Sequence, residues 1–300
     1  MAVLQNFTRS VVTCAANVAV MPQSRGPGVR RRVLAGALVR LREEAGLTFD
    51  DVVRELGFSK SKISRIESAV TGVSIADTKA LAETYRAGPE KAQWLLRLAK
   101  VAKKRGWWHV YGDVVFDWFS EYVALESEAV AIDTFEIDLV PGLFQTPEYA
   151  RWVMRTRTPD AADEVIHKRV ELRQARQQRV EDGSLSVWAI LDEAALRRAV
   201  GGGSHAAQLR HLLEIDTLPN VTLQVLPFGK GAHMAMGTAF TLLKFTDFPS
   251  VVYIDNLTGG LYLDDDTETE RYSVVMNHLR AAAWDPEESA AFIERVIADL

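Results

Sequence analysis

The sequence predicts a multidomain chain, with an all-α domain of five helices followed by a mixed α/β (α+β) domain whose small sheet is covered by helices. The 300 residues suit about two domains. Apolar residues recur at helical spacing from Arg30 to about Lys104, and beyond Arg105 strand-like runs alternate with helical ones. The charge changes sign at the same point, since residues 1–105 hold 19 basic and 9 acidic side chains while residues 106–300 hold 16 and 31. We therefore expect a basic helical domain at 29–105 and an acidic, Trp-rich effector or partner-binding domain at 106–300.

The segment ahead of the first helix has no long amphipathic period, so we expect residues 1–28 to form a flexible extension. Within it, Val11 to Val20 has the length of a signal-peptide core. Thr13 and Asn17 interrupt this stretch, and a basic helical domain follows, which disfavours that interpretation. Met21 is an alternative start codon, so a true start near Met21 stays open.

Composition excludes several classes of protein. With 48% apolar and 25% charged residues, the chain is typical of globular proteins and not of disordered ones. No uninterrupted apolar stretch reaches the ~18 residues that a membrane span needs, so we expect no membrane partner. A single cysteine, Cys14, rules out an internal disulfide and a cysteine-built zinc site, and it favours a cytoplasmic location.

The first predicted helix runs from about Arg30 to a stop at Gly46. Its apolar residues fall on one stripe at three-and-four spacing. These residues are Val33, Leu34, Ala37, Leu38 and Leu41.

The next two predicted helices are short and are separated by a tight turn at Gly57. Thr48 has the position of an N-cap, with Asp51 three residues later as the acidic member of a capping box. Ser59 has the N-cap position before the third helix. A short helix, a tight turn and a second short helix form the helix-turn-helix arrangement.

Two further helices complete the first domain. Ser74 and Asp77 predict the cap of the fourth helix, which buries Leu81 and Tyr85. Pro89 opens the fifth helix. Its apolar stripe is Ala92, Leu95, Leu96 and Ala99.

Beyond Arg105 we expect four strands and six helices. The predicted strands are Ser186–Leu191, Val221–Leu226, Phe240–Phe245 and Val251–Asp255. The predicted helices are Glu121–Ile132, Pro147–Arg157, Ala161–Val180, Ala206–Leu213, Asp266–Ala283 and Pro286–Asp299.

Burying Ile63 and Ile66 turns the polar residues of the third helix outward, as a helix that reads the major groove requires. We expect Lys60, Ser61 and Arg65 to contact bases, because Lys and Arg donate to guanine and Ser bonds bases or phosphates. The residues expected to contact the DNA backbone are Thr48, Ser59, Lys62 and Ser64. The alternative is that these residues form an ordinary solvated helix face. The helix caps, the turn at Gly57 and the excess of basic residues together favour DNA binding over this alternative.

Arg30, Arg31 and Arg32 at the start of the first helix are also candidates for contact with the DNA backbone or the minor groove. The alternative, an ordinary basic helix start, is equally well supported.

Two runs in the first domain carry a family resemblance: Leu41 to Thr48, and Leu56 to Glu67. They resemble the lambda-repressor/Cro (xenobiotic-response-element) type of DNA-binding domain. One departure is Phe49, where this type often has a glutamine that touches the phosphate backbone and a neighbouring reading residue. The departure leaves DNA binding expected but changes the scheme of contacts.

The second domain resembles the C-terminal domain of unknown function found in many actinobacterial regulators. The stretches that carry the resemblance are Arg105–Trp108, Leu139–Ala150, Leu191–Arg198, Val225–Phe228, Gly231–His233 and Leu257–Tyr262. The resemblance implies a cytoplasmic transcriptional regulator, often encoded beside a small partner protein that it is thought to bind.

The second domain lacks the sequence patterns of an enzyme. The six histidines are scattered, and neither a metal-binding spacing nor a Gly-x-Ser-x-Gly elbow occurs, so we expect no enzyme, no cofactor and no metal. Four polar residues at or just beyond strand ends, together with two aromatic residues, are nevertheless candidates for a ligand or partner pocket. The polar residues are Asp192, Glu193, His233 and Asp255, and the aromatic residues are Trp188 and Tyr253.

The sequence therefore predicts a repressor-like regulator that reads double-stranded DNA with the helix from Lys60 to Ser68. We expect a homodimer, because such domains usually read two half-sites one helical turn apart. The C-terminal domain would sense a ligand or a small partner protein. The alternative is an interaction protein that mainly holds a small neighbouring protein and regulates its own synthesis, and an enzyme is the weakest hypothesis.

Overall fold

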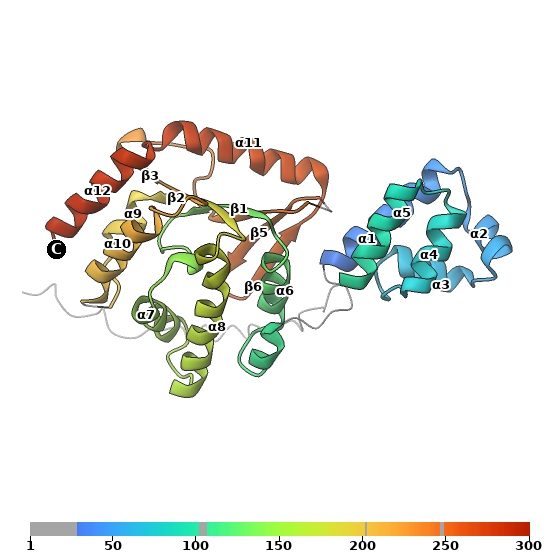
Figure 1. Cartoon of the computed structure of the whole chain (residues 1–300), viewed down its shortest axis with the longest axis horizontal. Coiled ribbons are helices and arrows are strands. Elements are labelled where there is room, and N and C mark those ends of the chain that lie inside the picture. Colours follow the sequence, from blue (N-terminus) through green and yellow to red (C-terminus); the bar gives the residue numbers. More distant parts are fainter. Residues whose placement is uncertain (1–28, 102–106, 202, 247–248) are drawn as a thin grey trace, which may run out of the picture.

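The computed structural model describes residues 29–101, 107–201, 203–246 and 249–300 (Figure 1). The predicted extension over residues 1–28 and the domain boundary at Arg105 lie outside these ranges.

The helical domain has the five helices that the sequence predicts. They are α1 (Val29–Glu44), α2 (Phe49–Leu56), α3 (Lys60–Glu67), α4 (Ile75–Thr84) and α5 (Pro89–Val101). Their ends follow from local chemistry: Ser74 accepts a hydrogen bond from the backbone N–H of Asp77 and so caps α4. Leu38, Leu81 and Tyr85 are buried at the centre of this domain.

The second domain is built on a six-stranded sheet with the order β3-β2-β1-β4-β5-β6. The strands are β1 (Ala131–Glu136), β2 (Ser186–Asp192), β3 (Val221–Leu226), β4 (Phe240–Lys244), β5 (Val251–Asn256) and β6 (Gly259–Leu263). Strands β1, β2 and β3 pair in parallel, whereas β4, β5 and β6 pair in antiparallel fashion with their neighbours. The predicted mixed fold with helices over a sheet is confirmed.

Helices cover both faces of this sheet, with α11 on one face and α6, α7 and α8 on the other (Figure 1). The helices and short turns of the second domain are η1 (Trp107–Tyr111), α6 (Asp117–Glu126), η2 (Gly142–Phe144), α7 (Pro147–Arg157), α8 (Asp163–Glu181), α9 (Glu193–Arg197), α10 (Ser204–Ile215), η3 (Phe228–Lys230), α11 (Asp266–Ala282) and α12 (Pro286–Ala298). Within the described ranges, no helix combines the length and the apolar character needed to cross a membrane.

The structure corrects the predicted helix over Glu121–Ile132. Helix α6 ends at Glu126, and β1, the strand between the parallel and antiparallel halves of the sheet, begins at Ala131. The sequence pattern misses β1 because Asp133 lies in its middle, and this carboxylate is neutralised by two residues far away in sequence, Lys244 and Arg280.

The sequence pattern also misses β6, because Gly259 and Gly260 open this strand and are more typical of a turn. A Cβ atom on Gly260 would lie 2.4 Å from the ring of Tyr253 on the neighbouring strand. Glycine is therefore needed here for close packing between β5 and β6.

The two domains meet through α1. Arg32 Nε lies 3.2 Å from Asp264 Oδ2, and Arg40 Nη1 lies 3.2 Å from Asp266 Oδ2. Between these two acidic residues, Asp265 accepts hydrogen bonds from the N–H groups of Thr267 and Glu268 and caps α11.

Candidate nucleic-acid interface

The turn between α2 and α3 has the geometry that the sequence predicts. Thr48 and Asp51 form a complete capping box at the start of α2. Hydrogen bonds from Thr48 lower the pKa of Asp51 and keep this carboxylate ionised. Gly57 ends α2 in the left-handed conformation with φ 67°, and Ser59 accepts from the N–H of Lys62 to start α3.

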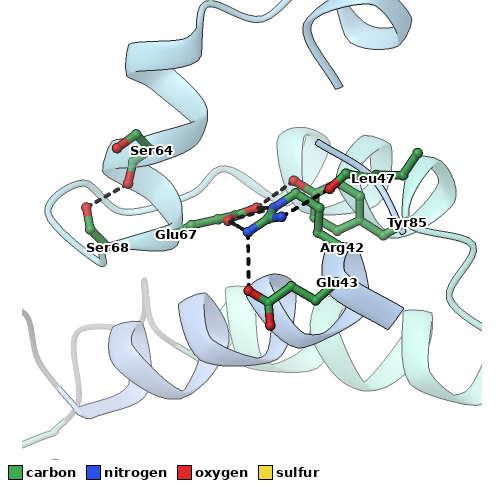
Figure 2. A network of polar contacts seen from close by, with 7 residues as sticks. All are labelled: Arg42, Glu43, Leu47, Ser64, Glu67, Ser68 and Tyr85. Atoms are coloured by element: carbon green, nitrogen blue, oxygen red, sulfur yellow. Dashed lines mark hydrogen bonds and ion pairs between the residues drawn. The ribbon is translucent and has the colours of Figure 1, made fainter. Parts of the chain in front are cut away.

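The inner face of α3 is held by a buried ion pair to which the sequence pattern alone assigns no role (Figure 2). Arg42 Nε lies 3.0 Å from both carboxylate oxygens of Glu67, and Arg42 Nη2 lies 2.9 Å from Oε2. Tyr85 donates to Glu67 Oε1 at 2.8 Å, and Arg42 also donates to the carbonyl of Leu47. Only 3% of the Glu67 side chain is exposed, so this network ties α3 to α1 and to the end of α4.

A sequence signal for this network exists. Glu67 stands four residues after Ile63 and therefore falls on the buried face of α3, where a carboxylate requires a partner. Burial and the hydrogen bond to Glu67 raise the pKa of Tyr85, so its hydroxyl stays protonated and donates.

Phe49, the residue that departs from the family pattern, belongs to the same assembly. Its ring is partly buried and lies 4.7 Å from the Arg42 guanidinium carbon. At this position the chain uses an aromatic ring to support the ion pair that orients α3.

The three residues predicted to contact bases share the exposed face of α3. Ser61 and Arg65 are exposed, and the Arg65 guanidinium has no polar partner in the part of the chain that the structure describes. Lys60 is also exposed, and its Nζ lies 2.6 Å from Asp50 on α2. An exposed ion pair of this kind is weak, so Lys60 can exchange Asp50 for a nucleic acid at little cost.

The residues of the helix-turn-helix that are predicted to contact the DNA backbone fall into two groups. Ser59, Thr48 and Ser64 are exposed around α3, although the first two already serve as helix caps. Lys62 is turned toward α4, where Nζ lies 2.8 Å from Asp77 and 3.5 Å from the centre of the Phe58 ring.

Among the arginines at the start of α1, Arg31 is exposed, and the Arg30 side chain lies outside the described part of the structure. Arg32 faces the second domain and pairs with Asp264. Its contact with the DNA backbone remains a prediction.

The structure does not bring together the six candidate pocket residues of the second domain. Trp188 pairs in register with Asp133, whereas Tyr253 pairs with Thr241, which in turn pairs with Thr134. Cross-strand partners share a face and consecutive residues alternate, so Trp188 and Tyr253 point to opposite faces of the sheet.

The other four candidates have partners of their own. Asp192 caps α9, Glu193 binds Arg197 and the N–H of Phe228, and His233 meets the ring of Phe135 edge-on. Asp255 pairs with Arg157 and lines a cavity beside α7 and α8. Strands β2 and β5 end at the same edge of the sheet, but β1 and β4 lie between them, so Asp192 and Glu193 are separated from Asp255.

Among the residues that the structure describes, no group of three or more His, Cys, Asp or Glu side chains is arranged to hold a metal ion.

Comparison with known families agrees with this geometry. Residues 33–95 match the model of a helix-turn-helix domain, and residues 119–295 match a family described as a domain of unknown function, DUF5753. No curated protein and no solved structure matches the chain. The helix-turn-helix domain supports a DNA-binding regulator. Since the second match covers more than half of the chain, the protein belongs to the DUF5753 family.

Proposed function

We propose that this protein is a sequence-specific transcriptional regulator of the lambda-repressor/Cro type that reads the major groove with α3. The observation that carries the proposal is the division of α3 into two faces. The inner face is fixed by the Arg42–Glu67 pair, and the outer face presents exposed Lys60, Ser61 and Arg65. A rigidly held helix with polar side chains turned outward is the arrangement that direct readout requires.

In this proposal Lys60, Ser61 and Arg65 contact base edges, while Ser59, Ser64 and Thr48 contact phosphates. The free N–H groups at the start of α3 add a favourable site for a phosphate. The protein acts in the cytoplasm. It binds DNA as a homodimer, because two half-sites one helical turn apart double the number of contacts with DNA.

A selection from random duplexes tests the proposal even though the operator is not identified. The purified full-length protein is mixed with a pool of random double-stranded DNA, and the bound fraction is amplified and sequenced. We expect a recurring motif with two related halves, and we expect Arg65→Ala to lose it. A bound fraction with no recurring motif would contradict sequence-specific reading.

A second candidate function is the capture of a small partner protein by the C-terminal domain, with DNA binding used for autoregulation. A surface groove supports it, because exposed Met234, Met236 and Leu261 line this groove together with residues of α11. Exposed methionines and leucine along a groove are typical of surfaces that bind a partner helix or loop.

Co-purification separates the two candidates. If the protein is mainly an interaction module, a small protein co-expressed from the neighbouring gene stays bound in equal amount, and Met236→Glu releases it. If nothing is retained, the regulator proposal stands alone.

We further propose that the protein is not an enzyme and uses no cofactor. Structural roles of the histidines support this proposal: His205 bonds the carbonyl of Leu196, and His233 packs on Phe135.

A further inference from the structure

The C-terminal domain contains a cavity that no motif in the sequence indicates. It lies between the beginning of α6, the end of α7 and the middle of α8, and its volume is about 140 Å³. Phe116, Trp118 and Phe119 form an aromatic wall, in which the rings of Phe116 and Trp118 stack 5.6 Å apart. The basic residues on the other side are Arg157, Arg169, Arg173 and Arg176, with Asp255 beside them.

Two of the four guanidinium groups are paired with carboxylates of the protein. Arg176 binds Glu126 through two parallel hydrogen bonds of 2.6 and 2.7 Å, and both side chains are buried. Arg157 Nη1 lies 3.1 Å from Asp255.

The other two guanidinium groups have no carboxylate within ion-pair distance in the described part of the structure. Arg169 donates to the carbonyl of Val114 at 2.8 Å and lies 4.7 Å from the centre of the Phe116 ring. Arg173 donates to Gln145, and its Nε is buried with no hydrogen-bond partner.

Neighbouring acidic groups do not remove this excess of positive charge. Glu126 is already engaged by Arg176. Burial, reinforced by the charges of Asp138 and Asp255, raises the pKa of Glu136 to about 8, so this carboxyl is mostly protonated at neutral pH. Burial, together with the nearby Arg176 and Arg157, lowers the pKa of Arg173 to about 9.

A buried guanidinium without a counterion costs stability, and proteins usually pair such a group. A ligand that brings a negative charge would compensate for the cost, and an aromatic wall beside the charge favours a ligand with an apolar body. A cavity of about 150 Å³ lined by apolar groups is large enough for benzene, which sets the size of that body.

We propose that this cavity binds a small organic acid, in which a carboxylate pairs with Arg173 and Arg169 and a compact apolar body of about one ring lies against Phe116, Trp118 and Phe119. The inference rests on the sensing role proposed above for the C-terminal domain and gives that role a site and a ligand class. The cavity is too small for a segment of a partner protein larger than one side chain.

Thermal unfolding of the full-length protein tests the proposal. The probes are benzoate and phenylacetate, with benzyl alcohol as the uncharged analogue and inorganic phosphate as the anion without an apolar body. A ligand at about one hundred times its Kd raises the unfolding temperature of a domain of this size by about 5 °C or more. We expect this rise with the carboxylates and not with benzyl alcohol or phosphate.

The variant Arg173→Met decides whether the effect arises in this cavity. Because Met removes an unpaired buried charge and keeps most of the side-chain volume, we expect the ligand-free variant to unfold at the same or a higher temperature than the wild type. We also expect it to lose the carboxylate response. The matched control is Arg210→Met at an exposed position of α10, which should keep that response.

Three results would overturn the proposal. They are the absence of any carboxylate-dependent rise in the wild type, an equal rise with benzyl alcohol, and an equal rise in Arg173→Met. None of these measurements uses DNA, so a failure of the ligand site and a failure of DNA reading are observed separately.

Discussion

Glu67 is one carboxylate on which the orientation of α3 depends. It is buried, and it accepts hydrogen bonds from Arg42 and Tyr85, which belong to two other parts of the helical domain. Such a contact fixes the direction in which the exposed residues of α3 point.

Replacing Glu67 with Ala removes the buried counterion of the Arg42 guanidinium and leaves only Glu43, whose exposed carboxylate lies 3.8 Å away. Removing one partner of a buried ion pair costs about 3–5 kcal/mol, so we expect a loss of this size in the free energy of unfolding. Tyr85→Phe is the matched control, because it removes a single hydrogen bond to a charged group and should cost about 1.5–3 kcal/mol. Urea unfolding followed by circular dichroism measures both, and equal losses would show that the ion pair adds nothing beyond one hydrogen bond.

Arg65 is the exposed residue of α3 that most directly tests base reading. We expect Arg65→Ala to weaken binding to the selected site by about 1–3 kcal/mol and to change binding to scrambled DNA much less. Arg65→Lys keeps the charge but loses the forked donor, so it should retain non-specific binding and lose selectivity. Fluorescence anisotropy with both duplexes gives the two affinities, and an equal loss on scrambled DNA would assign Arg65 to a phosphate.

At the scale of elements, the turn at Gly57 sets the angle between α2 and α3. With φ at 67°, this position is strained for any residue with a side chain.

Gly57→Ala should therefore lower the free energy of unfolding by roughly 1–2 kcal/mol. Gly36→Ala is the control, because Gly36 lies inside α1 and a Cβ atom there would meet nothing within 4 Å. This second change should raise stability by roughly 0.5–1 kcal/mol. Thermal or urea unfolding compares the two, and a change of the same sign in both would contradict the role assigned to the turn.

Glu136 at the end of β1 makes the stability of the protein depend on pH. The pKa of this carboxyl is about 8 in the folded protein against an ordinary value of 4.5, so the folded state holds a proton that the unfolded state releases. The contribution of Glu136 to the free energy of unfolding is fully present below about pH 4.5 and falls as the pH rises toward 8. Above about pH 8 it no longer changes.

Glu136→Gln imitates the protonated carboxyl at every pH. We expect the variant and the wild type to have similar stability near pH 5, and we expect the variant to be more stable near pH 8. Unfolding temperatures of the two proteins across this range provide the measurement. A difference that shrinks as the pH rises would contradict the raised pKa.

Much of the fold could be predicted because its signals are local. The capping box of Thr48 and Asp51, the cap at Ser59 and the turn at Gly57 each depend on residues within a few positions, and all of them are present. The exposed face of α3 follows from the same helical period.

Features that depend on distant partners could not be predicted. Strand β1 contains Asp133, whose charge is acceptable only because Lys244 and Arg280 are brought beside it by the fold. The pairing of Arg32 with Asp264, 232 residues away, has no local signal either. The arginine-lined cavity is assembled from three helices and a strand end, so no single stretch of sequence reveals it.

At the scale of the whole molecule, oppositely charged residues of the basic and the acidic domain form the contact between the two domains. Arg32 and Arg40 of the basic domain meet Asp264 and Asp266 of the acidic domain through ion pairs that are partly or fully exposed. Exposed pairs of this kind contribute little and weaken with salt. The acidic domain would be repelled by DNA, so the domains must be arranged with α3 toward DNA and the acidic surface away from it.

The central claim is that α3 reads a specific DNA sequence, and its most direct test is the affinity of the full-length protein for its selected site and for a scrambled duplex across a salt series. We expect a specific complex that loses about a thousandfold or more in affinity between about 50 and 200 mM salt. Lys60→Ala combined with Arg65→Ala should reduce binding to the level of scrambled DNA. Weak binding that is equal on both duplexes, and equal in the variant, would contradict reading by α3 and would favour partner binding by the C-terminal domain instead.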